Sequence, residues 1–243
     1  MPGDIRPDNL FGSRLCIIDP SAHETKRMQY SAITLIMSGG LFWSLAYVMI
    51  IYRSIRDSTY GMPVIACCMN LSWEFIYLFV YPHAFPAPQR MVNAVWLPLD
   101  LIILFFIIRF GPGENGTITG RQFYLFVALC LILFPLIFIY AHQNGIYSIT
   151  SSYAHNLIMS ILFIGMLFKQ RGIRGQSIYI AIAKMFGSLS ISLLLMFVFS
   201  ANRANGTATM IIMYVSVFFL DVSYAILIYR KIRERRINPW TRI

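Results

Sequence analysis

Four ionisable side chains lie inside otherwise apolar stretches of the chain: Glu74, Asp100, Lys184 and Asp221. Moving a charge from water into hydrocarbon is so costly that such a side chain is normally paired, protonated or turned toward a polar cavity. A carboxyl group that keeps its proton in a water-poor place can serve as a general acid. These residues therefore predict acid chemistry inside a membrane, most directly at Glu74.

The depths of the four groups suggest two pairs. With a rise of about 1.5 Å per helical residue, Glu74 and Asp100 lie roughly 10 Å from one membrane face, on neighbouring spans. Asp221 and Lys184 lie roughly 20 Å from the same face, on the last two spans. We expect an Asp221–Lys184 ion pair, which serves structure as readily as catalysis. Two carboxyl groups at one depth cannot both ionise cheaply, so we expect Glu74 or Asp100 to hold a proton.

Other polar and aromatic side chains near these acids are candidates for supporting a substrate site. They are Asn70, Trp73, Tyr77, Trp96, His155 and Asn156. Aromatic faces stabilise cations by about 2 kcal/mol or more where water is excluded. Most aromatic residues of a membrane protein only pack, however, and a lone histidine there is more often structural. A purely structural alternative for Glu74 is a protonated carboxyl group that is hydrogen-bonded to Asn70, one helical turn earlier.

The motifs of metal and phosphate chemistry are missing from the sequence. It has no zinc-ligand spacing, no phosphate loop, no GxSxG and no DDxxD-type cluster that would hold Mg²⁺. We therefore expect no metal and no cofactor. Acid chemistry without a metal remains.

Seven apolar stretches must position these residues. The chain has 243 residues, of which 58% are hydrophobic and only 12% are charged, too few charges to cover a soluble domain. At roughly 20 residues per crossing, seven spans use most of the length. The predicted fold is all-α, an integral membrane bundle of seven transmembrane helices. The expected spans are 32–52, 62–81, 92–108, 123–141, 149–168, 177–199 and 208–229.

The basic residues indicate how the bundle is oriented. The formal net charge is +10, and five cations directly follow the last span: Arg230, Lys231, Arg233, Arg235 and Arg236. This placement is typical of a positive-inside cluster and not of nucleic-acid binding. We therefore expect a luminal segment 1–31, a membrane domain 32–229 and a basic cytosolic tail 230–243. The sequons at Asn115 and Asn205 lie on opposite sides of the membrane, so glycosylation tests this orientation.

Several short blocks together resemble a known enzyme family. They are Tyr60-Gly61-Met62-Pro63, Asn70-Leu71-Ser72-Trp73-Glu74, Trp96 with Asp100, Asn156 with Met159-Ser160, and Asp221 in the last span. The chain resembles, from about residue 30 to 230, the small seven-helix terpene cyclases of fungal meroterpenoid and indole-diterpene pathways. The Asn-x-x-Trp-Glu block is the most specific part of this resemblance.

The resemblance implies a metal-independent terpene cyclase in the endoplasmic reticulum membrane. Family members are thought to use an acidic residue at the Trp-Glu position and another in the last helix to protonate the terminal epoxide of a prenyl chain. These roles carry over to Glu74 and Asp221. The implied substrate is an epoxidised farnesyl or geranylgeranyl group on a polyketide-derived or indole head, and an isomerising carbocation cascade turns it into a polycycle. No oligomeric state follows from the sequence.

Two observations complicate a shared acid role for Glu74 and Asp221. On the span limits above Asp221 lies about 10 Å deeper than Glu74, and a neighbouring Lys184 favours an ionised Asp221. The main alternative is a seven-helix transporter that uses the same carboxyl groups as a proton relay. The lack of an internal repeat and the Trp-Glu block count against it. A non-catalytic receptor-like protein is a second alternative, and it predicts no dependence on Glu74.

Overall fold

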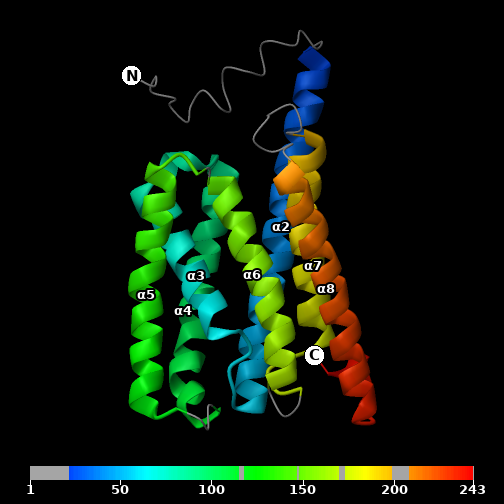
Figure 1. Ribbon diagram of the computed structural model, residues 1–243. Coiled ribbons are helices and arrows are strands. Elements are labelled where there is room, and N and C mark those ends of the chain that lie inside the picture. The colour runs from blue at the N-terminus through cyan, green and yellow to red at the C-terminus, as the bar shows by residue number, and fades with distance from the viewer. Residues whose placement is uncertain (1–21, 115–117, 147, 170–172, 199–207, 243) are drawn as a thin grey trace.

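Long apolar helices dominate residues 22–114, 118–146, 148–169, 173–198 and 208–242, which are the residues that the computed structural model describes (Figure 1). All of the regular structure in these ranges is helical. The main helices are α2 (Ala22–Asp57), α3 (Val64–Phe75), α4 (Ala87–Glu114), α5 (Gly120–Gln143), α6 (Ser148–Lys169), α7 (Ile178–Leu193) and α8 (Ala208–Glu234). Shorter elements are the π-helices η1 (Ile76–Val80) and η3 (Leu194–Val198) and the 3-10 helices η2 (Pro82–Ala84) and η4 (Pro239–Thr241).

The predicted all-α membrane bundle is confirmed. Six helices in the described ranges are long and apolar enough to cross a membrane, and the shorter apolar helix Val64–Val80 is the seventh. Several helices extend beyond the spans that hydropathy predicts; α2 begins at Ala22 and α4 runs from Ala87 to Glu114. Residues 1–21, and the sequons at Asn115 and Asn205, lie outside the described residues.

The short α3 ends in a π-turn for a local reason. The Tyr81 amide donates to the Ile76 carbonyl (2.8 Å), which closes the wider turn of η1. Pro82 follows, and it has no N–H with which to continue the helix. The chain therefore leaves the helix at Tyr81 and turns through η2 into α4.

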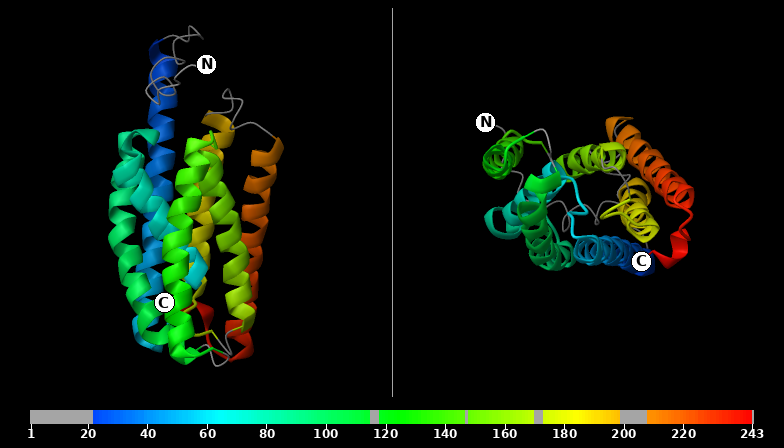
Figure 2. Two further views of the ribbon diagram at one scale, coloured as in Figure 1. Left: turned by 60° about the vertical axis from the view of Figure 1, so that its left-hand side comes forward. Right: turned by 90° about the horizontal axis from the view of Figure 1, so that it is seen from below.

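The helices surround the middle of the bundle. Helix α2 packs against α4 and α7, α8 packs against α6 and α7, and α3 packs against α4, α5 and α6. Seen along the bundle axis, α5 and α8 lie at opposite ends, whereas α2, α3, α6 and α7 face the middle (Figure 2).

Two adjacent glycines let α2 approach both of its neighbours closely. A Cβ atom on Gly39 would lie 2.7 Å from Ile191 Cδ1 of α7, and one on Gly40 would lie 2.6 Å from Val92 Cγ2 of α4. Small residues at such crossings allow close helix packing in membranes. The Gly-Gly pair thus fixes α2 between α4 and α7.

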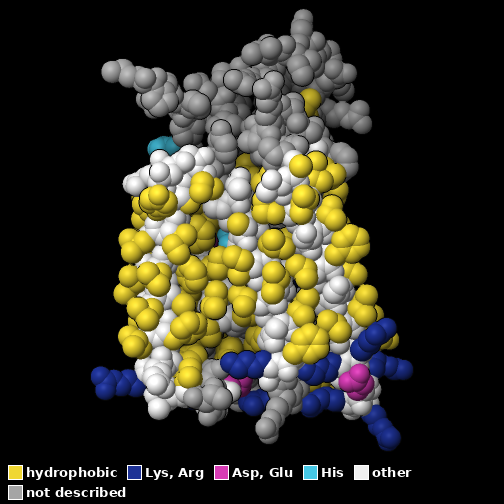
Figure 3. All heavy atoms as spheres, viewed as in Figure 1, with side chains coloured by type: hydrophobic (Ala, Val, Ile, Leu, Met, Phe, Trp, Pro, Cys, Tyr) yellow, Lys and Arg dark blue, Asp and Glu magenta, His cyan; other side chains and the backbone are white. Residues whose placement is uncertain are grey.

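The surface has an apolar flank and one charged end. Hydrophobic side chains cover the flank in Figure 3, and Lys and Arg gather along its lower edge, where α2, α4, α6 and α8 end. Many large apolar side chains of the described residues are more than half exposed, for example Phe79, Phe105 and Ile132. This is the surface that a lipid bilayer requires.

The last residues of the chain fold back onto this charged end. The Arg242 guanidinium donates to Asp57 Oδ2 (2.6 Å) and to the Ile173 carbonyl (2.7 Å). Asp57 also accepts from the Gly175 amide (2.8 Å) and pairs with Arg53. The segment predicted as a basic tail, 230–243, is therefore helical up to Glu234 and then docks on the bundle.

Candidate active site

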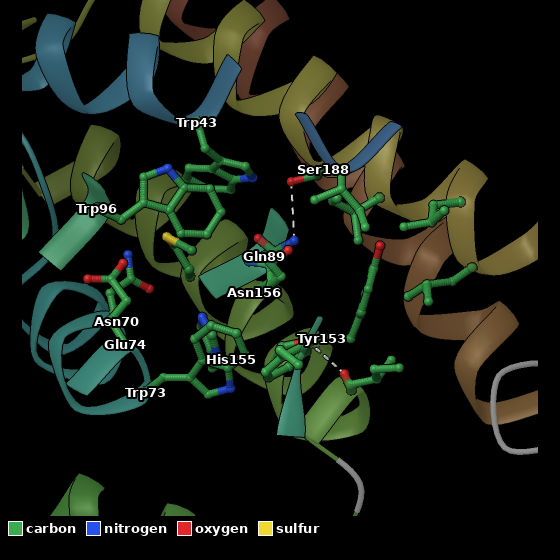
Figure 4. Close-up of a pocket in the computed structure, with 18 of the residues that line it drawn as sticks. Trp43, Asn70, Trp73, Glu74, Gln89, Trp96, Tyr153, His155, Asn156 and Ser188 are labelled. Atoms are coloured by element: carbon green, nitrogen blue, oxygen red, sulfur yellow. Dashed lines mark hydrogen bonds between the residues drawn. The ribbon is translucent and has the colours of Figure 1, made fainter. Parts of the chain in front are cut away.

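A cavity of about 130 Å³ lies between α2, α3, α4, α6, α7 and η3 (Figure 4). It is located in the half of the bundle that is farther from the basic end. Its aromatic lining residues are Trp43, Tyr47, Trp73, Phe85, Trp96 and Tyr153. Its polar lining residues are Asn70, Glu74, Gln89, Ser152, His155, Asn156 and Ser188. Helices α5 and α8 contribute none of the described lining residues, so Asp221 does not face the cavity.

Helical periodicity brings the polar residues of α3 to one face. Asn70, Trp73 and Glu74 have the spacing i, i+3, i+4, which places side chains on one side of a helix. Ser152, His155, Asn156 and Met159 do the same on α6. Since α3 packs against α6, these two faces meet at the cavity.

Glu74 is the one carboxyl group among the described residues that line the cavity, and it is only 1% exposed. Its Oε2 accepts no hydrogen bond from the described residues. Asp100, which is fully buried, lies behind it and contacts Glu74, Asn70 and Tyr47. The structure therefore brings Glu74 and Asp100 together as the depth argument predicts, with Glu74 on the cavity side.

The Asn70 amide is held by a tyrosine of α2. Its Nδ2 donates to Tyr47 Oη (2.6 Å), and Asn70 lies beside Glu74 in Figure 4. Tyr47 Oη also approaches the Asp100 carboxyl group. The carboxyl pair is thus surrounded by uncharged polar groups, an environment that suits a shared proton better than two full charges.

The predicted ion pair between Asp221 and Lys184 is present, away from the cavity lining. Both side chains are about 1% exposed. Ser160 Oγ donates to Asp221 Oδ1 (2.9 Å) and accepts from Lys184 Nζ (2.6 Å). The two acids that the sequence assigns to one role are therefore in different surroundings: Glu74 faces the cavity, and Asp221 is bound to a cation.

Helix α6 supplies the polar wall opposite Glu74. Asn156 Nδ2 donates to Ser188 Oγ (3.1 Å), and its Oδ1 has no hydrogen-bond partner among the described residues (Figure 4). The His155 ring packs against Trp73, with ring centres 5.8 Å apart. Tyr153 Oη shares a hydrogen bond with Ser192 Oγ (3.0 Å).

The predicted aromatic residues have different positions. Trp73 and Trp96 line the cavity, and Trp96 Nε1 donates to Ser44 Oγ (3.1 Å). Tyr77 is buried behind the lining and packs on Trp73, with ring centres 4.9 Å apart. Tyr77 therefore supports Trp73, and it does not meet the cavity.

Trp43 and Tyr47 of α2 also line the cavity, and they are not among the site residues predicted from the sequence. They are four residues apart and so share a helix face, and Ile36, another lining residue, is seven residues before Trp43. This periodicity was readable in the sequence. Helix α2 carries no ionisable residue near them that would have drawn attention to that face.

The arrangement combines one acid with a cavity that has a largely apolar and aromatic lining. Such a site can protonate a weakly basic oxygen of an apolar molecule and stabilise a positive carbon that results. In the part of the chain that the structure describes, no three His, Cys, Asp or Glu side chains are close enough to hold a metal ion. Glu74 is the lining residue that can transfer a proton.

Comparison with known proteins identifies the family. A family model for Pyr4-like transmembrane terpene cyclases matches residues 19–235. Terpene cyclase pyr4 of Aspergillus fumigatus is 39% identical over 79 residues, and the match spans 32% of this chain and 32% of that protein. Terpene cyclase dpmpB of Macrophomina phaseolina is 27% identical over 199 residues, 78% of this chain and 82% of that protein. Asnovolin H synthase nvfL of Aspergillus novofumigatus is 23% identical over 228 residues, 88% of this chain and 91% of that protein.

No solved structure matches the chain significantly. The family model, however, covers most of the chain, including all of the cavity-lining residues. Its description as a transmembrane family agrees with the membrane bundle. The chain belongs to the Pyr4-like transmembrane terpene cyclases.

Proposed function

We propose that this protein is a metal-independent cyclase that protonates the terminal epoxide of a prenylated meroterpenoid precursor, most simply an epoxyfarnesyl group on an aromatic head. The observation that carries the proposal is Glu74, a buried carboxyl group that opens onto an aromatic cavity with one oxygen free of hydrogen bonds from the described residues. Membership in a cyclase family favours this function over a transporter.

Proton transfer from Glu74 to the epoxide oxygen starts the proposed reaction. The bond between this oxygen and the more substituted carbon breaks, and the oxygen keeps the electron pair as a hydroxyl group. The carbocation is attacked by the next double bond, and ring closure repeats along the chain. Loss of a proton from the last cation ends the sequence, so that substrate and product have the same formula and the reaction is an isomerisation.

The surroundings of Glu74 suit this chemistry. A cavity with an apolar lining protects cations from capture by water, and Trp43, Trp73 and Trp96 can stabilise positive carbon through their ring quadrupoles. Asp100 contacts Glu74 from behind, so the two carboxyl groups can share one proton. Glu74 is therefore proposed to protonate the reacting oxygen, and Asp100 is proposed to support Glu74 by sharing its proton.

We also propose that the protein lies in the endoplasmic reticulum membrane with its C-terminus in the cytosol. The gathering of Lys and Arg at the end of α8 supports this orientation (Figure 3). The cavity then opens in the luminal half of the bundle, and an apolar substrate can reach it from the lipid. A glycan attached at Asn115 would contradict the orientation.

Membranes from a heterologous host that carry wild type or Glu74→Gln test the acid. Both are incubated with an epoxyfarnesyl-aromatic substrate in the presence of EDTA, and the products are followed by mass spectrometry. We expect wild type to cyclise the substrate and Glu74→Gln to lose at least about 100-fold in rate, because removing a general acid costs about 10²–10⁴-fold. Glu234→Gln, an exposed carboxyl group at the end of α8, is the matched control and should keep full activity.

The outcomes separate the parts of the proposal. Full activity of Glu74→Gln at equal protein level would reject Glu74 as the acid. Loss of wild-type activity in EDTA, with recovery on adding Mg²⁺, would reject the metal-independent mechanism. A wild type that leaves the epoxyfarnesyl substrate and a geranylgeranyl-indole epoxide unchanged would reject epoxide cyclisation.

A further inference from the structure

Asp221 is in the wrong place to deliver a proton to the cavity. It is about 1% exposed, is not among the lining residues, and forms an ion pair with Lys184. Its Oδ1 also accepts a hydrogen bond from Ser160 Oγ (2.9 Å). The carboxyl group of Asp221 is therefore already engaged by an ammonium group and a hydroxyl group. It has no direct path to a molecule in the cavity.

Trp43 lies between this ion pair and the cavity. Lys184 Nζ is 5.5 Å from the centre of the Trp43 ring, and Trp43 lines the cavity. Gly187, three residues after Lys184 on α7, leaves room for the indole, because a Cβ atom there would be 2.6 Å from Trp43 Cδ1. Tyr47 packs against the same indole, with ring centres 5.8 Å apart. The ring is therefore held from outside the cavity by a cation and by a close backbone.

We infer that Asp221 and Lys184 are a positioning pair that holds the Trp43 indole as a wall of the cavity. Asp221 acts through Lys184, and it does not donate the proton that starts the reaction. This inference rests on the proposed cyclase function and assigns a role within it. The wall matters because a polyene folds against it before ring closure, and because a loosely held ring admits water to the cations.

Charge balance distinguishes a positioning pair from a second acid. If Asp221 only neutralises and orients Lys184, removing one charge is harmful and removing both is tolerated, because a buried unpaired charge is far worse than no charge. If Asp221 is an acid, its carboxyl group is needed whatever stands at position 184. The single variants Asp221→Asn and Lys184→Gln and their combination form a double-mutant cycle that separates the two roles.

We expect each single variant to lose about 100-fold in kcat/KM, the scale of loss that a small misplacement in an active site produces. Both should also release more partly cyclised and water-quenched products. The combined variant, in which Asn and Gln can still hydrogen-bond with each other and with Ser160, should return to within about tenfold of wild type. It should also regain the wild-type product set.

Two further variants show that the recovery is specific. Lys184→Gln should not restore activity to Glu74→Gln, because that carboxyl group is proposed to act on the substrate. Trp43→Leu should give the same by-products as Asp221→Asn and should not be improved by Lys184→Gln. Protein level in the membrane and the thermal midpoint in detergent are measured for every variant, since a purely structural defect lowers these quantities without changing the product set.

A combined variant that is present at the wild-type level but is as inactive as Asp221→Asn would overturn the inference, because the carboxyl group itself would then be required. If Asp221→Asn does not accumulate, the combined variant is compared with wild type, and a loss of about 100-fold at the wild-type protein level would overturn the inference.

Failure of the proposed function has a different signature, namely no product from wild type. Binding of the non-epoxidised prenyl phenol, followed by quenching of tryptophan fluorescence, then tests the positioning pair by itself. Weaker binding in both single variants and recovery in the combined variant would support the pair, and equal binding in all four proteins would overturn it.

Discussion

Asn156 lines the cavity, and only one end of its amide group is hydrogen-bonded within the described residues. Its Nδ2 donates to Ser188 Oγ (3.1 Å), whereas Oδ1 is buried without a partner among the described residues. A buried acceptor without a hydrogen bond costs about 1–3 kcal/mol, so a ligand that supplies a donor is favoured. We expect this donor to be a hydroxyl or N–H group on the head of the substrate.

Replacing Asn156 by Leu should therefore lower kcat/KM by about 10- to 100-fold, which corresponds to roughly 1–3 kcal/mol. The loss should disappear for a substrate whose head-group hydroxyl is methylated, because such a substrate cannot donate. Steady-state kinetics with the free and the methylated substrate, in wild type and variant, measure the difference. An equal loss with both substrates would show that Asn156 only shapes the cavity.

At the residue scale, the sequence predicts which ionisable side chains meet, but it does not predict which acid faces the cavity. Opposite charges at one depth in the last two spans were enough to predict the contact between Asp221 and Lys184, and two acids at one depth predicted the contact between Glu74 and Asp100. Which acid faces the cavity depends on how each helix is rotated about its axis. That rotation is set by packing against neighbours, and one sequence does not contain it.

At the scale of the elements, the crossing of α2 and α4 is fixed by Gly40. A Cβ atom there would meet Val92 Cγ2 at 2.6 Å, and the Gly40 carbonyl lies near Trp96 Nε1 (3.4 Å) of the cavity wall. Gly40→Ala should therefore push α2 and α4 apart and destabilise the bundle by about 1–3 kcal/mol, the usual cost of overpacking. Thermal unfolding in detergent measures the change.

The matched substitution is Gly165→Ala on α6, where an added Cβ atom has no neighbour within 4 Å. It should leave the midpoint unchanged or raise it slightly, because alanine favours a helix more than glycine does. Adding Val92→Ala to Gly40→Ala should recover part of the loss, since it removes the clashing methyl groups. A Gly40→Ala variant as stable as Gly165→Ala would mean that the crossing adjusts freely.

Hydropathy predicts where the membrane helices lie, but it does not predict the residues at which they end. Apolar runs located every crossing, because burial in lipid requires them. The ends are set by local geometry instead: α3 stops where Pro82 removes an N–H, and α4 continues to Glu114, which pairs with Arg174 (3.6 Å) at the charged end. The proline effect is local, whereas the pairing of Glu114 with Arg174 joins residues far apart in the chain, and hydropathy values predict neither of them.

At the scale of the whole molecule, the two ends of the bundle have separate tasks. The half that is farther from the basic end holds the cavity, and the basic end holds a network centred on Asp57. The chain returns to this network after α8, and η4 presents Trp240 to Tyr179, whose hydroxyl group donates to the Trp240 carbonyl (2.7 Å). We therefore expect that stability and catalysis can be changed independently.

Arg242→Ala tests this separation, because Arg242 joins three parts of the chain. Its guanidinium is 13% exposed and donates to Asp57 of α2 and to the carbonyls of Ile173 and Gln176. Hydrogen bonds of charged groups contribute about 1.5–3 kcal/mol each, but Arg53 and the Gly175 amide still bind Asp57 when Arg242 is lost. We therefore expect a loss of roughly 1–3 kcal/mol in unfolding free energy.

Below the unfolding transition, Arg242→Ala should keep the wild-type kcat/KM and product set, because none of its contacts reaches the cavity. Arg233→Ala, an exposed cation in the last turn of α8, is the control and should not lower the thermal midpoint. A midpoint for Arg242→Ala equal to that of Arg233→Ala would show that the docked C-terminus adds nothing to stability. A changed product set at full stability would show that the basic end communicates with the cavity, against the division of tasks that the structure indicates.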